Sequence, residues 1–214
     1  MEVDIKKTII NDDAELKKPA LRLSLIVYGR EHVGTKVKYL IDPKGQGDKK
    51  EIPENIVLIR WRKKISKGYT FSGDRLGPNV WHGLSTALGA VPNAAWLKWT
   101  AEDISSQLHA ARDQMGIYKS SVPNASAVHA LIQICGVERL KAIFTRHLDP
   151  NRSHIYGTPD LFLYARDAKG IACIGRFVEV KRPDERFKSG QLEEIDFLQS
   201  LGLRARVARL IERS

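Results

Sequence analysis

The chain has 214 residues, of which 43% are hydrophobic and 28% are charged, and this composition is typical of a globular protein with one sizeable domain. Its formal net charge of +10 is unusual and indicates a polyanionic partner, although many basic proteins bind no nucleic acid. Because no run of 18 apolar residues occurs and no charged-then-apolar leader opens the chain, we expect neither a membrane partner nor a Sec-type export signal.

The N-terminal half is predicted to mix strands, loops and short helices. Residues 1–17 are charged and lack periodicity, so we expect a loose arm or an edge strand. β-Branched and aromatic residues predict strands over Leu21–Tyr28 and Thr35–Ile41, whereas Ile56–Ile59 begins either a strand or a helix. Between Gly68 and Pro92, the many glycine, proline and asparagine residues predict loops with one short helix.

A cluster of cations lies directly before Gly68, in the sequence Arg60-Trp61-Arg62-Lys63-Lys64-Ile65-Ser66-Lys67. Cations around an aromatic side chain could bind phosphates while the ring stacks on a nucleic-acid base. The alternative is a solvated face with Trp61 packed inward. The sequence leaves both interpretations open.

Three helices are predicted in the middle of the chain. Thr100, followed by two acidic residues, has the pattern of a helix start. A second helix covers Ala125–Cys135, and a third covers Val137–Leu148 after a break at Gly136. Both cysteines of the chain lie in apolar runs, which favours two reduced thiols in the core over a disulfide or a metal pair.

From Gly157 the pattern changes to strand, turn, strand, helix and strand, which is the order of a compact α/β unit. The two strands are apolar and are joined by a polar turn, as in a hairpin. The helix is expected from Ser189 to Leu201, where Gly202 stops it, and the last strand covers Leu203–Ile211.

Two carboxylates and an ammonium group meet at one end of this strand pair. Asp160 begins the first strand, and because side chains on a strand alternate, Glu179 and Lys181 of the second point the same way while Val180 points into the core. Hydrolysis of a phosphodiester requires charge neutralisation and an activated water, and a divalent metal held by carboxylates supplies both. We therefore expect Asp160, Glu179 and the Val180 carbonyl to bind the metal. Lys181 would orient or deprotonate the water or stabilise the developing charge.

Each of these residues also has an ordinary structural explanation. An aspartate after proline is often only a turn former, and a Glu-x-Lys on an edge strand is often a solvated pair. Gln191, near the start of the next helix, could bind a nucleic-acid backbone, position a metal-bound water, or simply face solvent. Because both acids adjoin apolar strands at a spacing that a hairpin would bring together, a nuclease is the leading hypothesis.

These segments resemble the VRR-NUC branch of the PD-(D/E)XK nuclease superfamily. The resemblance rests on Gly157-Thr158-Pro159-Asp160-Leu161, on Val178-Glu179-Val180-Lys181, on Gln191 after a polar loop, and on the Leu201-Gly202 pair before the last strand. The segment Leu131–Asp149 also resembles the helices that precede the nuclease strands of the Fanconi-associated nuclease.

The resemblance implies an α/β fold like that of restriction endonucleases, with a mixed sheet flanked by helices and a mixed α+β N-terminal region. It also implies that Asp160 and Glu179 are ligands of Mg²⁺ or Mn²⁺ and that Lys181 is catalytic, with Gln191 part of the same site. We expect a nuclease domain at residues 121–214 and an N-terminal region at residues 1–120 that forms a substrate- or partner-binding lobe.

The chain departs from the family pattern at two places. The family contributes another acid from an upstream helix, and no motif identifies it here; Glu138 is the favoured candidate and Glu102 the other. After the lysine, Arg182-Pro183 replaces the usual Gly-Pro, and the usual tryptophan on the glutamine helix is absent. These changes leave the preferred DNA structure open.

Three functions remain open at this point. The first is a metal-dependent DNA endonuclease of the cytoplasm that acts on branched or flapped DNA in repair or phage replication. The second is an antibacterial toxin DNase, secreted into the cytoplasm of a target cell and neutralised by an immunity protein. The third is a catalytically inactive DNA-binding module. DNA is the expected partner in each, and the oligomeric state is left open.

Overall fold

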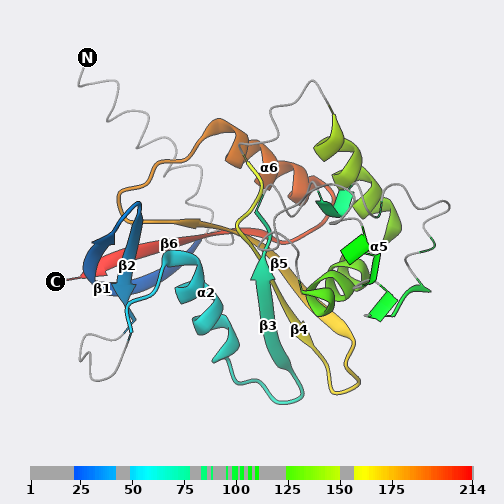
Figure 1. Ribbon diagram of the computed structural model, residues 1–214, viewed down its shortest axis with the longest axis horizontal. Coiled ribbons are helices and arrows are strands. Elements are labelled where there is room, and N and C mark those ends of the chain that lie inside the picture. The colour runs from blue at the N-terminus through cyan, green and yellow to red at the C-terminus, as the bar shows by residue number, and fades with distance from the viewer. Residues whose placement is uncertain are drawn as a thin grey trace.

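In the computed structural model, the described part of the chain forms six strands and three main helices, which are shown in Figure 1. The described residues are 22–41, 49–77, 83–85, 88, 95, 98–100, 102–103, 106–107, 109–110, 124–149 and 157–213. The elements are, in chain order, β1 (Arg22–Val33), β2 (Lys36–Leu40), α2 (Pro53–Arg62), β3 (Thr70–Arg75), α5 (Ala125–Leu148), β4 (Leu161–Arg166), β5 (Ala172–Lys181), α6 (Ser189–Ser200) and β6 (Ala205–Arg213). The predicted N-terminal arm lies outside the described residues, as does much of the helix predicted after Thr100.

The strands form one six-stranded mixed sheet in the order β2-β1-β6-β5-β4-β3 (Figure 1). Strand β6 pairs in parallel with β1 and β5, while the pairs β1–β2, β3–β4 and β4–β5 are antiparallel. The parallel pair β5–β6 is connected through α6, as such a crossover requires. The predicted α/β fold with a mixed sheet flanked by helices is thus confirmed. Strands from both sides of residue 120 belong to this one sheet.

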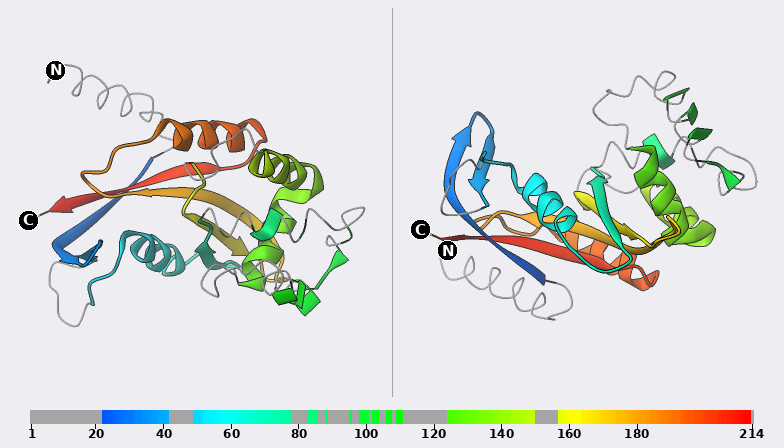
Figure 2. Two further views of the ribbon diagram at one scale, coloured as in Figure 1. Left: turned by 45° about the horizontal axis from the view of Figure 1, so that its top comes forward. Right: turned by 90° about the horizontal axis from the view of Figure 1, so that it is seen from below.

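Helices cover both faces of the sheet, with α2 on one face and α6 on the other (Figure 2). A hydrophobic core lies on each face of the sheet, and because side chains alternate along a strand, neighbouring residues pack into different cores. Phe162 and Phe177 pack with buried residues of α5 and α6, whereas Leu161 and Val178 pack with buried residues of α2. We call the second side the α2 face. The near-continuous burial of β4 and of the end of β5 follows from this two-sided cover.

Several predicted elements are confirmed, and their boundaries have physical causes. Gly136, inside α5, has φ 68° and ψ 178°, so the two helices predicted around it meet at a non-helical residue. The segment left open at Ile56–Ile59 is helical, and Pro53 in its first turn suits a helix start. Gly202, with φ 74°, follows the end of α6.

Two predictions were wrong. Strand β3 occupies a segment for which loops were predicted, because its pairing with β4 outweighs the weak strand preference of Ser-Gly-Asp. A Cβ at Gly73 would lie 2.8 Å from Leu163 Cδ2, so this glycine permits close approach of the strands. The second wrong prediction is that both cysteines lie in the core. Cys135 is buried, as expected, and burial raises the pKa of its thiol to about 12. Cys173 is exposed, because the first half of β5 is less covered than its end.

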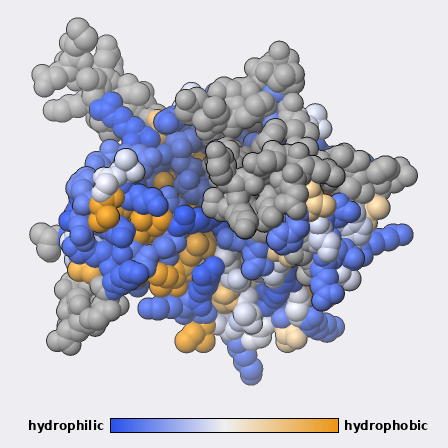
Figure 3. All heavy atoms as spheres, in the orientation of Figure 1, coloured by the Kyte–Doolittle hydropathy of each residue, from blue (hydrophilic) through white to orange (hydrophobic). Residues whose placement is uncertain are grey.

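The described surface is mostly hydrophilic, with smaller hydrophobic patches on the side drawn in Figure 3. None of the described helices combines the length with the apolar character that a membrane span needs.

Candidate active site

The pairing of β4 with β5 brings the predicted acids together. Leu161 pairs with Val178, so Asp160, directly before β4, lies opposite Glu179. One carboxylate oxygen of Asp160, Oδ2, accepts a hydrogen bond of 2.8 Å from the Val180 N–H. This bond fixes the carboxylate at the end of the sheet where β5 ends.

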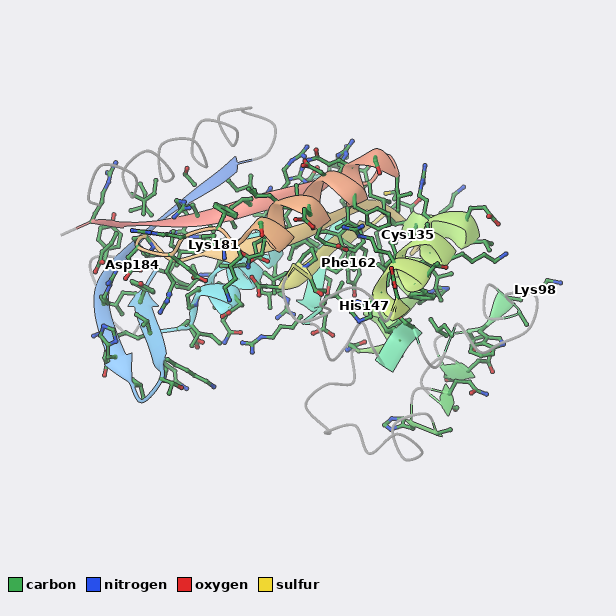
Figure 4. All side chains as sticks on the ribbon, turned by 90° about the horizontal axis from the view of Figure 1, so that it is seen from above. Lys98, Cys135, His147, Phe162, Lys181 and Asp184 are labelled. Carbon is green, nitrogen blue, oxygen red and sulfur yellow. The ribbon has the colours of Figure 1, made fainter. Side chains whose placement is uncertain are left out.

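Glu179 and Lys181 lie on the α6 side of the same strand end, where Lys181 is labelled in Figure 4. The Lys181 Nζ is 3.1 Å from Glu179 Oε1 and 3.3 Å from Glu185 Oε1, and the lysine side chain is only 1% exposed. Gln191 Nε2, on the first turn of α6, donates to the same Glu179 Oε1. Glu179 Oε2 is buried and has no hydrogen-bond partner. The lysine and the glutamine therefore hold one oxygen of Glu179 and leave the other open.

Burial makes the charged forms of both acids unfavourable. It is the largest cause that raises the pKa of Asp160 to about 6. The hydrogen bond from the Val180 N–H lowers this pKa, whereas the nearby charge of Glu54 raises it. Burial also raises the pKa of Glu179 to about 8, with the charge of Asp160 as the next cause, while Lys181 opposes the rise. A half-buried and a buried carboxylate that resist ionisation side by side form an environment that a cation would stabilise.

The two acids open into a cavity of about 450 Å³. It is lined by the turn between β1 and β2, the start of α2, the end of β3, the end of β5 and the start of α6. Its charged and amide side chains are Lys36, Glu54, Arg75, Asp160, Glu179, Arg182, Glu185 and Gln191. Lys181 is not among the lining residues, and its ammonium lies between the carboxylates of Glu179 and Glu185. The cavity thus combines acids at its base with cations that suit a phosphate.

The structure brings an acid into this cavity that the sequence patterns did not identify. Glu54 lies in the first turn of α2, lines the cavity, and is close enough to Asp160 to raise its pKa. Glu138, the favoured candidate, does not line the cavity; its side chain is 87% exposed and lies 3.7 Å from Lys141. Glu102 is exposed and does not line the cavity either. The available signal for Glu54 was its place directly after a proline at a helix start.

The donor set fits a hard divalent cation. Carboxylates and main-chain carbonyls are the oxygen ligands that Mg²⁺ takes, and Glu179 offers an oxygen that is both buried and without a partner. Val180 lines the cavity between the two acids. Within the described part of the chain, no three acidic, histidine or cysteine side chains are gathered into a complete metal site. A metal here would be held by two carboxylates with other oxygen donors.

Trp61 is not a base-stacking platform. Its side chain is 3% exposed, its ring meets Phe71 edge to face at 5.1 Å, and its Nε1 donates a 3.0 Å hydrogen bond to the Tyr164 carbonyl. The inward-packed alternative is therefore confirmed for the tryptophan, while the lysines and arginines around it lie at the surface of the α2 face.

Comparison with known proteins gives one family and one fold. The family model described as the VRR-NUC domain matches residues 97–210. The crystal structure of paFAN1 bound to 2nt 5'flap DNA with gap is similar over 92% of this chain and 38% of that chain, with 19% identity and a TM-score of 0.54. The structure of paFAN1 bound to 1nt 5'flap DNA with gap matches over 91% and 38%, with 18% identity and a TM-score of 0.48. No curated protein matches.

The chain therefore spans well under half of the paFAN1 chain. The structural match is wider than the family match, so the shared fold includes part of the chain before residue 97, where strands β1, β2 and β3 lie.

Proposed function

The chain belongs to the VRR-NUC family, and from this premise we propose that it is a divalent-metal-dependent DNA endonuclease that hydrolyses phosphodiester bonds at the cavity between α2 and α6. The observation that carries the proposal is the pairing of two acids, the half-buried Asp160 and the buried Glu179, of which Glu179 keeps one buried oxygen without a hydrogen-bond partner. Buried polar atoms are normally satisfied, so such an oxygen suits a ligand.

Asp160, Glu179 and the Val180 carbonyl would hold Mg²⁺ or Mn²⁺, while Glu54, an acid from the upstream helix α2, faces the same cavity. When bound, the metal would neutralise charge on the phosphate and lower the pKa of a bound water. Gln191 would keep Glu179 in position through its hydrogen bond to Oε1.

Lys181 has its ammonium between two carboxylates, those of Glu179 and Glu185. In this arrangement it partly offsets the negative charge of Glu179. From this position Lys181 would orient the attacking water or stabilise the charge that develops in the reaction.

The cations that line the cavity, Lys36, Arg75 and Arg182, suit the phosphates on either side of the scissile bond. Arg75 is oriented by a 2.8 Å hydrogen bond to Asn55 Oδ1. The paFAN1 structures hold DNA with a 5' flap, and flapped or branched DNA is accordingly the substrate that we propose to test first.

The test is cleavage of supercoiled plasmid and of flapped duplexes with Mg²⁺ or Mn²⁺, with EDTA as the metal-free control. We expect Asp160→Asn and Lys181→Ala to abolish cleavage and Asp196→Asn, which removes an exposed carboxylate on α6, to retain it. Cleavage that survives both site substitutions would refute the proposed site. Binding of DNA with no cleavage of any form would instead favour the inactive DNA-binding module.

A further inference from the structure

Four cations from three elements gather on the α2 face of the sheet, outside the cavity. They are Lys64 after α2, Arg176 in β5, Arg204 directly before β6 and Arg206 in β6, and we call them the basic cluster. Arg176 precedes Val178 by two residues and so shares its face of the sheet, and Val178 pairs with Arg206 in the β5–β6 register. The cluster is therefore built by strand pairing.

The cluster concentrates positive charge without a counter-charge. Burial lowers the pKa of Arg176, and the charges of Arg204 and Arg206 lower it further. Burial and then Arg204 lower the pKa of Arg206, while burial and then Arg176 lower that of Lys64. Across the described residues, no carboxylate lies within ion-pair distance of any of the four. Cations held close together in this way are stabilised by an anion.

Arg176 also has an unmet hydrogen-bonding group. Its Nε is buried and has no hydrogen-bond partner. The Arg176 Cζ lies 5.1 Å from the centre of the Trp61 ring, and Lys64 Nζ lies 4.6 Å from it. Because the indole is fixed by its bond to the Tyr164 carbonyl, it holds both cations in place by cation–π contact. The cluster is therefore preorganised.

Helix α2 connects the cavity with the cluster. Pro53 and Glu54, at its start, line the cavity, and Lys64 follows its end. With a rise of about 1.5 Å per residue, Lys64 lies about 15 Å from Glu54 along the helix axis. On B-form DNA, where each strand advances about 3.4 Å per nucleotide, this distance corresponds to about four or five nucleotides.

We propose that the basic cluster binds the phosphate backbone of the DNA arm that leads away from the catalytic cavity, about half a helical turn from the scissile phosphate. This inference rests on the proposed nuclease function and extends it to a second contact. The helix dipole explains the cations in the last turn of α2, Arg60 and Arg62, as local stabilisation. It does not explain Arg176, Arg204 and Arg206, which lie on strands or directly before one.

The experiment measures binding of a fluorescent duplex of about 20 base pairs, in EDTA so that no cleavage occurs, over a range of NaCl concentrations. The test protein is the double variant Arg204→Gln/Arg206→Gln, and Lys64→Gln, at an exposed position, is a second variant. The control is Arg139→Gln/Lys169→Gln, which removes the same charge from two exposed positions elsewhere. Thermal unfolding establishes that each variant is folded.

We expect the Arg204→Gln/Arg206→Gln variant to bind about tenfold more weakly and the slope of log Kd against log salt to fall by about two, as for the loss of two phosphate contacts. Lys64→Gln should lower the slope by about one, and the control should match the wild type.

Two results would overturn the assignment: unchanged binding in both cluster variants, or equal weakening in the control. The nuclease proposal is judged separately by Mg²⁺-dependent cleavage by the wild type. Cleavage without cluster dependence refutes only the cluster, and cluster-dependent binding without cleavage refutes only the nuclease.

Discussion

Replacing Asp160 by asparagine should make the metal-free protein more stable while it abolishes cleavage. The amide oxygen of asparagine can still accept the hydrogen bond from the Val180 N–H, so the packing at the strand end is kept. What is lost is a half-buried negative charge close to that of Glu54. A residue kept for function at the expense of stability is expected at an active site.

The size of the effect follows from the pKa of the carboxyl. Its value in the folded chain is about 6, against an ordinary value of 3.8. Because the folded value is the higher one, ionisation destabilises the fold, beginning above pH 3.8 and reaching its full extent above about pH 6. At about 1.4 kcal/mol per pKa unit, the full effect is about 3 kcal/mol, and only a small part of it is present near pH 4.

Urea unfolding in EDTA, at about pH 4 and about pH 7.5, measures this difference. Asp160→Asn should exceed the wild type by about 3 kcal/mol at the higher pH and by less than about 1 kcal/mol at the lower. Asp196→Asn, the exposed control, should stay within about 0.5 kcal/mol of the wild type. The reasoning would be refuted if Asp160→Asn were less stable than the wild type at pH 7.5. It would also be refuted if the difference in free energy of unfolding were the same at both pH values.

Two further substitutions probe how α6 is positioned. Gly157→Ala should lower the free energy of unfolding by more than about 2 kcal/mol, because Gly157 has φ 147° and a Cβ there would lie 2.1 Å from the Gly190 carbonyl oxygen. Denaturant unfolding measures the loss, and Gly77→Ala, at a position with open space around it, is the control. Gln191→Ala should reduce metal affinity and cleavage rate by about 10- to 100-fold, since Glu179 loses the amide that orients it. Calorimetric metal titration measures the affinity, and an unchanged affinity would contradict this role of Gln191.

Much of the fold could be predicted from the sequence because its signals are local. The break at Gly136 and the stop at Gly202 depend on one residue each, and both were found. The strand pair with Asp160 and Glu179 carries its own turn and its own alternation, so their meeting followed from the hairpin alone.

The parts that were missed depend on contacts between distant segments. Strand β3 exists because β4 pairs with it, and its own residues have weak strand preference. Glu54 lies near Asp160 only because α2 packs on the face of the sheet, and no spacing within the sequence records that proximity. Glu138 was favoured for lying on the helix before the nuclease strands, yet that helix turns its glutamate to solvent.

The measurement that tests the catalytic site most directly is the single-turnover rate of DNA cleavage, with saturating Mg²⁺, by Glu179→Gln beside Glu193→Gln. The first removes the charge of the buried acid, and the second makes the same change at an exposed position on α6. We predict a fall of about 100-fold or more for Glu179→Gln and no change for Glu193→Gln. A Glu179→Gln rate within about threefold of the wild type would contradict the assignment of this cavity as the catalytic site.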